Sequence, residues 1–223
     1  PPGKILSGEI IFNNKDFLKL TAKELQERRG RDIAMIFQDP MTSMNPVLTI
    51  GEQIIETLLR HTLLSRNEAR KKSFDLLKQV DIPSPEQKLD QYPHQLSGGM
   101  RQRAMIAMAL SCSPRVLIAD EPTTALDVLI QAQILELLKQ VKQNTQMSIL
   151  LITHDLGVVA EIAERVMVMY AGEIVESGPV RELFRSPLHP YTIGLMKAIP
   201  TLESTQQKIS KLNEISGTVP SLS

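Results

Sequence analysis

Two short apolar runs separated by an amphipathic segment constrain the fold of this chain more than any other feature. Val116–Ala119 and Ser148–Ile152 have the length and composition of buried strands. The apolar residues of one helical face recur between them: Ile130, Ile134, Leu137, Leu138 and Val141. A strand, a helix and a second strand of this kind predict a βαβ unit with parallel strands and a right-handed crossover. We therefore predict an α/β protein with its functional residues at the carboxyl ends of these strands.

Three candidate functional residues follow these two strands. Asp120 and Glu121 end the first strand, and His154 lies just past the second. Adjacent carboxylates at a strand end suit phosphate hydrolysis, in which the first acid orients Mg²⁺ and its waters and the second accepts a proton from water. The imidazole of His154 is expected within reach of the same phosphate. The alternative is a strand that ends in solvated acids, with a structural or solvated histidine.

Gln38 extends this candidate site to a third strand. The apolar run Ile33–Phe37 ends at Gln38-Asp39-Pro40, where proline stops strand pairing. The amide oxygen of Gln38 could bind Mg²⁺ or the attacking water. An isolated glutamine in this position is otherwise an ordinary loop residue.

The run Leu96-Ser97-Gly98-Gly99-Met100 leads directly into a predicted helix, Arg101–Leu110. Glycines 98 and 99 let a ligand approach the backbone closely, and the hydroxyl of Ser97 adds a donor. A helix N-terminus favours an anion such as a terminal phosphate. The alternative is an ordinary Ser-Gly-Gly helix cap.

Composition argues against several other classes of protein. The 25 Lys and Arg residues balance the 25 Asp and Glu residues, so no overall field attracts nucleic acid or an acidic membrane surface. The single cysteine, Cys112, excludes a disulfide within the chain. No run reaches the ~18 apolar residues of a membrane span, and we expect a soluble or peripheral protein.

We predict a main domain over residues 1–186 and a C-terminal extension over residues 187–223. Within the first, helical periodicity indicates a helical subdomain at about 49–113. Near the N-terminus, Ser7–Phe12 is predicted as a strand that ends at an Asn-Asn turn, and Thr21–Arg29 as a helix. The chain begins with Pro1-Pro2-Gly3-Lys4 rather than Met, so we expect it to be part of a longer protein.

The order of these motifs resembles that of the ATP-binding cassette family. Gln38 is followed by LSGGM, LIADE, ALD at Ala125–Asp127 and finally His154. The resemblance implies a P-loop NTPase fold of the ABC type, with a RecA-like parallel sheet and a helical subdomain. The segment Gln38–Pro46, Met100, the EPTTALDV run and the HPY sequence at His189–Tyr191 are similar to the branch that imports peptides or nickel, with peptide favoured.

The resemblance also implies a role for each site residue. Ser97, Gly98 and Gly99 bind the γ-phosphate of an ATP held by a second cassette. In the chain's own site, Asp120 positions Mg²⁺, Glu121 is the general base and His154 contacts the γ-phosphate, while Asp127 couples the two sites. Gln38 reports the nucleotide state to membrane subunits. The implied partners are a related but non-identical ATPase subunit, transmembrane permeases and, indirectly, a solute-binding protein, at the cytoplasmic face of a bacterial membrane.

The sequence departs from the family pattern in two places. A P-loop needs Gly, four residues and Gly-Lys-Ser/Thr, whereas the sequence has only Gly3-Lys4, followed by Ile5. We therefore expect the chain alone to be inactive toward ATP, and its incomplete sheet to leave apolar surface open on Val116–Ala119 and Ser148–Ile152. The cysteine-rich tail that follows a GTVP stretch in many relatives is absent, so no iron–sulfur cluster is assigned to this chain.

Two other functions fit parts of the sequence. One is a cassette without a P-loop that contributes only its Ser97–Gly99 loop to an intact partner's site. The other is an ABC-type ATPase acting on nucleic acid, against which the balanced charge and the Gln38–Pro46 segment weigh.

Overall fold

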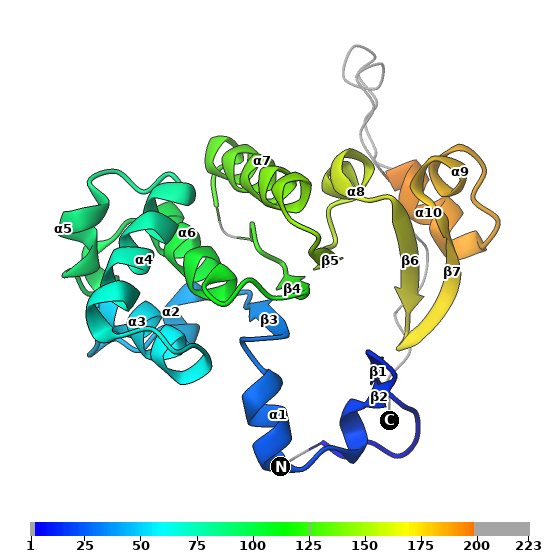
Figure 1. Ribbon diagram of the computed structural model, residues 1–223. Coiled ribbons are helices and arrows are strands. Elements are labelled where there is room, and N and C mark those ends of the chain that lie inside the picture. Colours follow the sequence, from blue (N-terminus) through cyan, green and yellow to red (C-terminus); the bar gives the residue numbers. More distant parts are fainter. Residues whose placement is uncertain (1–2, 125, 199–223) are drawn as a thin grey trace. The chain divides into compact units, whose positions relative to one another are not determined.

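The computed structural model describes residues 3–124 and 126–198, which divide into two compact units at Ile152/Thr153. Figure 1 labels the elements of both units. The boundary predicted at residues 186/187 was placed between the main domain and its C-terminal extension, not between compact units. It stays a prediction.

The first unit is built on a parallel sheet. Strands β3 (Ile33–Ile36), β4 (Val116–Asp120) and β5 (Ser148–Ile152) pair in the order β3-β4-β5, so β4 is the central strand. The helix α7 (Val128–Asn144) connects the two parallel strands β4 and β5. The predicted βαβ unit is therefore present, with both strands at the predicted positions.

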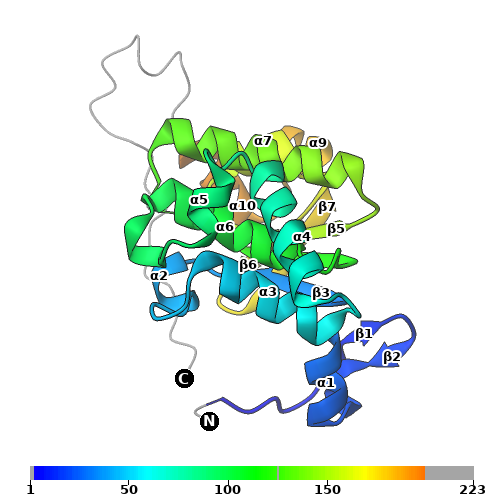
Figure 2. The ribbon, with the colours of Figure 1, turned by 60° about the vertical axis from the view of Figure 1, so that its left-hand side comes forward.

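One face of this sheet contributes to a continuous apolar core. Alternate residues Leu117 and Ala119 of β4 are fully buried, and Ile36 of β3 is equally inaccessible. They join the core with the inward face of α7, which includes Ile134 and Leu138. Figures 1 and 2 show α7 running along this side of the sheet.

The other face of the sheet is covered unevenly. Leu150 and Ile152 of β5 are 43% and 45% exposed, although both faces of a parallel sheet are ordinarily covered. The expected open apolar surface is therefore present on β5. It is absent from Leu117 and Ala119 of β4, because α6 and α7 contribute the core that covers them.

A helical region fills the sequence between β3 and β4, and the helical subdomain predicted at about 49–113 lies within it. Its elements are α2 (Pro40–Ser43), α3 (Ile50–His61), α4 (Arg66–Gln79), α5 (Pro85–Leu89), the 3₁₀ turn η2 (Pro93–Gln95) and α6 (Gly98–Leu110). Ile54, Leu58, Leu77 and Ile106 form its fully buried centre. Figure 2 shows α3, α4 and α6 gathered together. Ile106 of α6 belongs to the same core cluster as Leu117 of β4.

The N-terminal part of this unit is a short hairpin followed by a helix. Strands β1 (Ile11–Phe12) and β2 (Lys15–Asp16) flank Asn13 and Asn14, whose φ values of 49° and 59° form the predicted turn. The strand predicted over Ser7–Phe12 is thus shorter, because β2 offers only two residues for pairing. The turn η1 (Phe17–Lys19) and the helix α1 (Ala22–Arg28) follow.

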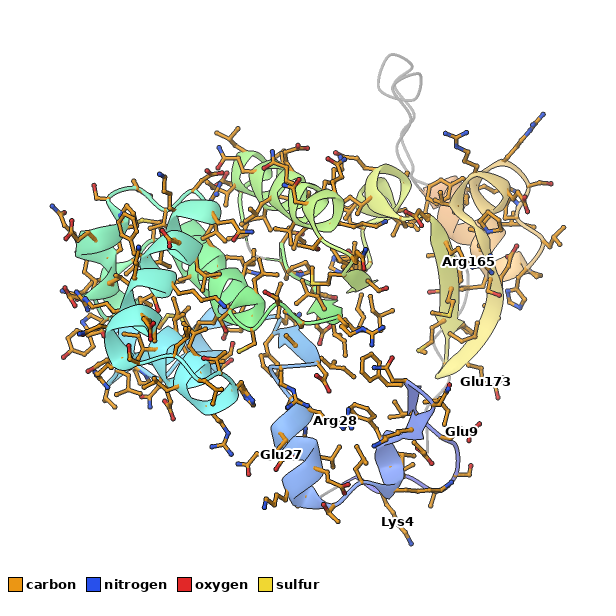
Figure 3. All side chains as sticks on the ribbon, in the orientation of Figure 1. Lys4, Glu9, Glu27, Arg28, Arg165 and Glu173 are labelled. Carbon is orange, nitrogen blue, oxygen red and sulfur yellow. The ribbon has the colours of Figure 1, made fainter. Side chains whose placement is uncertain are left out.

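Arg28 at the end of α1 ties the hairpin to the sheet. Its Nη1 lies 2.9 Å from Oδ2 of Asp32, just before β3, and its guanidinium lies 5.8 Å from the ring centroid of Phe17. Phe17 also packs edge-on against Phe12. Arg28 is labelled in Figure 3.

The second unit contains a hairpin flanked by helices. It comprises α8 (Leu156–Ile162), β6 (Arg165–Tyr170), β7 (Glu173–Pro179), α9 (Val180–Arg185) and α10 (Pro190–Ala198). β6 and β7 are antiparallel and joined by Ala171-Gly172, both with positive φ. Arg165 and Glu173, which begin the two strands, are labelled in Figure 3.

The HPY sequence begins α10 and is held by β7. The carboxylate of Glu176 accepts hydrogen bonds from the backbone N–H groups of Leu188 (2.9 Å) and His189 (3.0 Å). The Tyr191 ring lies 4.4 Å from that of Tyr170. The motif therefore has a local structural role, which is to fix the start of α10 on the hairpin.

None of the helices in the described ranges combines the length and the apolar character that a bilayer crossing requires, and the longest, α7, has 17 residues.

Candidate active site

The carboxyl ends of β3 and β4 bring Gln38 and Glu121 together, as the sequence predicted. Ile36 is in register with Ala119, so the residues that follow the two strands leave the sheet at the same level. The side-chain amide Nε2 of Gln38 donates a hydrogen bond of 2.8 Å to Oε2 of Glu121. Residues 83 positions apart in sequence thus share one polar cluster.

Glu121 has an unusual backbone conformation. Its φ of +44° lies in the left-handed region, which is unfavourable for a residue with a Cβ atom. Its N–H donates to the carbonyl of Ile152 in β5, and its carbonyl accepts from the N–H of Thr124. The turn after β4 therefore reverses immediately, and such strain is typically retained where the surrounding structure fixes it.

Thr124 is a site residue that the sequence analysis did not single out. Its Oγ1 donates a 2.8 Å hydrogen bond to Oε2 of Glu121, the same oxygen that Gln38 contacts. Two donors on one oxygen fix the orientation of the carboxylate. Two adjacent threonines after a Glu-Pro pair were the only signal in the sequence.

Asp120 ends β4 next to Glu121 and is partly buried. A partly buried carboxylate at a strand end is an oxygen donor of the type that Mg²⁺ prefers. Gln38 donates to Glu121 through its amide nitrogen, so its amide oxygen is left as a second neutral oxygen ligand. Asp120 and Gln38 therefore offer oxygen ligands of the kinds that Mg²⁺ accepts, and such an ion would neutralise charge on phosphate oxygens.

Ser97 caps the helix α6, which begins at Gly98. Its Oγ accepts a hydrogen bond of 3.3 Å from the N–H of Met100, and its side chain is exposed. The cap that the sequence left as an alternative is thus real. It is compatible with anion binding, because the first N–H groups of a helix have no intrahelical partner and lie at its positive end.

The two glycines of this loop differ in their surroundings. A Cβ atom on Gly99 would lie 2.9 Å from Cγ2 of Ile130 in α7, so glycine is required there for packing. A Cβ atom on Gly98 would meet only Cδ2 of Leu126, at 4.0 Å. Packing thus accounts for Gly99, whereas the open space at Gly98 is available to a ligand.

Asp127 caps α7 and faces the same region. Its Oδ1 accepts a hydrogen bond of 2.9 Å from the N–H of Ile130, whose side chain also limits the space at Gly99. Asp127 is exposed. The start of α6 and the start of α7 therefore form one surface that contains Ser97–Gly99 and Asp127.

Of the predicted site residues, His154 alone belongs to the second unit. It is exposed and precedes Asp155, whose Oδ1 caps α8 through the N–H groups of Gly157 and Val158. Its contact with a phosphate stays a prediction.

The fold and these motifs together define an ATP-binding cassette. The family model described as ABC transporter matches residues 3–124, and the chain belongs to this family. A second model, described as the C-terminal region of oligopeptide/dipeptide transporters, matches residues 175–223, which include the HPY sequence.

Curated relatives match the chain over its whole length. The oligopeptide transport ATP-binding protein OppD of Bacillus subtilis is 56% identical over 222 residues, and the match covers 100% of this chain and 62% of that protein. The dipeptide transport ATP-binding protein DppD of the same organism is 55% identical over 224 residues, covering 100% and 66%. The chain thus spans about two thirds of the length of these relatives.

Solved structures of cassettes share the fold. A dimeric ATP-binding cassette in a post-hydrolysis state, bound to ADP and phosphate, is 30% identical with a TM-score of 0.71, and the match covers 79% of this chain and 75% of that one. The protein cbiO1 of Clostridium perfringens, part of the ABC transporter complex cbiONQ, is 30% identical with a TM-score of 0.68, and the match covers 81% of this chain and 69% of that one. The predicted fold class is therefore confirmed.

Proposed function

We propose that this chain is the ATP-hydrolysing part of a subunit that powers peptide import through an ABC transporter. The observation that carries the proposal is the Glu121 carboxylate at the end of β4, oriented by Gln38 and Thr124 and adjacent to Asp120. The names of the oligopeptide and dipeptide relatives support peptide as the solute. Nickel is the second candidate.

In the proposed mechanism, each residue of the first unit has one role. Asp120, with the amide oxygen of Gln38, would hold the Mg²⁺ of bound ATP, and this ion would neutralise charge on the phosphate oxygens. Glu121 accepts a proton from the water that attacks the γ-phosphate, and Thr124 keeps its carboxylate in place. His154 contacts the γ-phosphate of the bound ATP.

A second ATP site is shared with a partner cassette. Ser97, Gly98 and Gly99 contact the γ-phosphate of an ATP held by a related, non-identical subunit, through the positive end of α6. Asp127 couples this site to Glu121, because it caps α7, whose Ile130 packs against Gly99, and lies six positions after Glu121 in sequence. The solved dimeric relative supports two cassettes around nucleotide.

The segment from Gln38 to Pro46 is proposed to contact the transmembrane permease. Met44 anchors it in the core, and the buried Gln53 holds it by accepting from the N–H of Asn45 and donating to the carbonyl of Leu48. Met41 and Val47 are 50% and 75% exposed on this anchored loop. The subunit would thereby be peripheral at the cytoplasmic face of the membrane, with a solute-binding protein as indirect partner.

The 223 residues contain no P-loop motif, the element that forms the cradle for the β- and γ-phosphates. We therefore propose that the chain by itself is inactive toward ATP. The intact Ser97–Gly99 loop also favours an alternative function, that of a cassette without a P-loop that serves only the partner's nucleotide. Mixing the chain with an intact cassette distinguishes a fragment of an ATPase from a partner cassette without a P-loop. Only the partner cassette is expected to restore hydrolysis without added P-loop sequence.

Uptake of a labelled peptide by membrane vesicles that contain the whole transporter tests the proposal. Glu121→Gln is expected to abolish ATP-dependent uptake, because the amide cannot accept the proton. Glu136→Gln is the matched control, since Glu136 is exposed on α7 and bonded to Gln140. Peptide uptake unaffected by Glu121→Gln overturns the proposed function, and ATP-dependent uptake of nickel but not peptide overturns the choice of solute.

A further inference from the structure

A buried glutamine in α6 connects the two parts of the candidate active site. Gln102 is only 2% exposed and lies within a helix that is otherwise largely apolar at its buried positions. Its Nε2 donates a hydrogen bond of 2.6 Å to the carbonyl oxygen of Pro122. Pro122 is the residue immediately after Glu121.

The carbonyl of Pro122 is part of the turn that sets the position of Glu121. That turn starts with the left-handed conformation of Glu121 and closes with the N–H of Thr124 on the Glu121 carbonyl. A rotation of the peptide after Pro122 would displace Thr124, and with it the hydroxyl that holds Oε2 of Glu121. A fixed Pro122 carbonyl therefore preserves the orientation of the carboxylate.

The same helix carries the Ser97–Gly99 loop at its start. Gln102 is one helical turn after Gly98, so both lie on the same side of α6. Its neighbour Arg103 fixes the helix further, donating 2.7 Å to the carbonyl of Val80 and 3.0 Å to Oε1 of Gln133 in α7. The start of α6 is thus held rigidly to the turn after β4.

We propose that Gln102 is a positioning residue for Glu121, acting through the carbonyl of Pro122. It links the loop that faces the partner's nucleotide to the carboxylate that serves the chain's own nucleotide. This inference rests on the proposed function, because it takes Glu121 to be the general base.

Two variants separate positioning from mere stabilisation. Gln102→Leu fills the same space without a donor. Gln102→Glu keeps the shape, but its ionised carboxylate repels the Pro122 carbonyl, whereas its protonated form can donate to it. Ser73→Ala is the control for removing a buried hydroxyl away from the site, since Ser73 is fully buried and donates to the carbonyl of Ala69 within α4.

The experiment measures kcat and KM for ATP in the whole transporter as a function of pH. Gln102→Leu is expected to lower kcat by ~10- to 100-fold, the order expected for a misplacement of about 1 Å, while KM stays within about 2-fold, because the nucleotide contacts lie elsewhere. For Gln102→Glu, the ratio of its kcat to that of the unsubstituted protein is expected to rise as the pH falls, because the new carboxyl becomes protonated. Ser73→Ala is expected to change neither constant.

Glu121→Gln in the same assay distinguishes the two levels of the proposal. If Glu121→Gln abolishes hydrolysis and Gln102→Leu keeps the full kcat, the positioning role is overturned and the proposed function stands. If Gln102→Leu does not fold, Gln102→Glu still decides, and a kcat ratio that does not change with pH overturns the role. Hydrolysis unaffected by Glu121→Gln overturns the proposed function and this inference together.

Discussion

The two adjacent glycines of the Ser97–Gly99 loop are expected to respond differently to replacement with alanine. Gly99→Ala should lower stability, whereas Gly98→Ala should leave stability intact and weaken function. A Cβ atom on Gly99 would come within 2.9 Å of Cγ2 and 3.5 Å of Cδ1 of Ile130. Since a branched side chain at the start of α7 has to move, the cost is that of overpacking, about 1–3 kcal/mol. Gly98→Ala meets no atom closer than 4.0 Å, and it is expected to leave stability unchanged or raise it by up to ~1 kcal/mol, because alanine favours helix.

The variant that is expected to be stable, Gly98→Ala, is also the one that is expected to lose function. Gly98→Ala is predicted to weaken ATP-dependent association with the partner cassette, because its methyl group occupies open space in front of the helix N-terminus. Denaturant unfolding of the full-length protein measures stability, and light scattering with and without ATP measures association. The double variant Gly99→Ala with Ile130→Ala removes Cγ2 and is expected to recover part of the loss, as an interaction term in the double-mutant cycle.

The reasoning is refuted if Gly99→Ala is as stable as the unsubstituted protein. It is equally refuted if the Ile130→Ala change adds its own cost to that of Gly99→Ala without any recovery. Gly98→Ala that associates normally with ATP would contradict the proposed phosphate contact at this glycine while leaving the packing argument intact.

Three further predictions concern other parts of the molecule. The hydroxyl of Thr192 and the N–H groups of Leu188 and His189 hold the pKa of Glu176 below its ordinary value of 4.5. The contribution of Glu176 to stability is therefore complete above pH 4.5 and is lost as the pH falls through the lowered pKa. Glu176→Gln is expected to reduce the amide-exchange protection of α10 at neutral pH, and this difference should vanish at low pH. Glu173→Gln is the control. Leu150→Thr is expected to reduce aggregation of the 223-residue chain in light scattering, because Leu150 is 43% exposed on a strand; a cooperative high-temperature melt of the unsubstituted chain would contradict this. Gln53→Leu is expected to lower transport coupling more than stability, measured as uptake per ATP hydrolysed, since it releases the loop at Asn45.

Local patterns in the sequence were sufficient to predict the elements that depend on residues close to one another in the chain. The βαβ unit at Val116–Ile152 follows from two apolar runs and one amphipathic face, and the structure has the same bounds for both strands apart from Asp120. The turn at Asn13-Asn14 follows from the tolerance of asparagine for positive φ. The pairing of Gln38 with Glu121 follows because parallel strands end at the same edge.

Other features depend on contacts that no local pattern indicates. The hairpin of β6 and β7 was not predicted, since Met167 and Met169 are exposed on β6 and Ala171-Gly172 is a weak turn signal. The predicted helix Arg101–Leu110 begins three residues earlier, at Gly98, because Ser97 rather than a later residue caps it. The bond from Gln102 to Pro122 joins residues 20 positions apart and required the packed structure.

The measurement that tests the central claim most directly is ATP hydrolysis by the purified transporter, with the partner cassette's own general base replaced so that the remaining rate reports on Glu121. The account predicts that Glu121→Gln lowers this rate by roughly 10²- to 10⁴-fold, the contribution of a positioned base, while ATP still binds. Glu136→Gln is expected to leave the rate unchanged. A Glu121→Gln transporter that hydrolyses ATP at the unsubstituted rate would contradict the assignment of Glu121, and with it the account of this site.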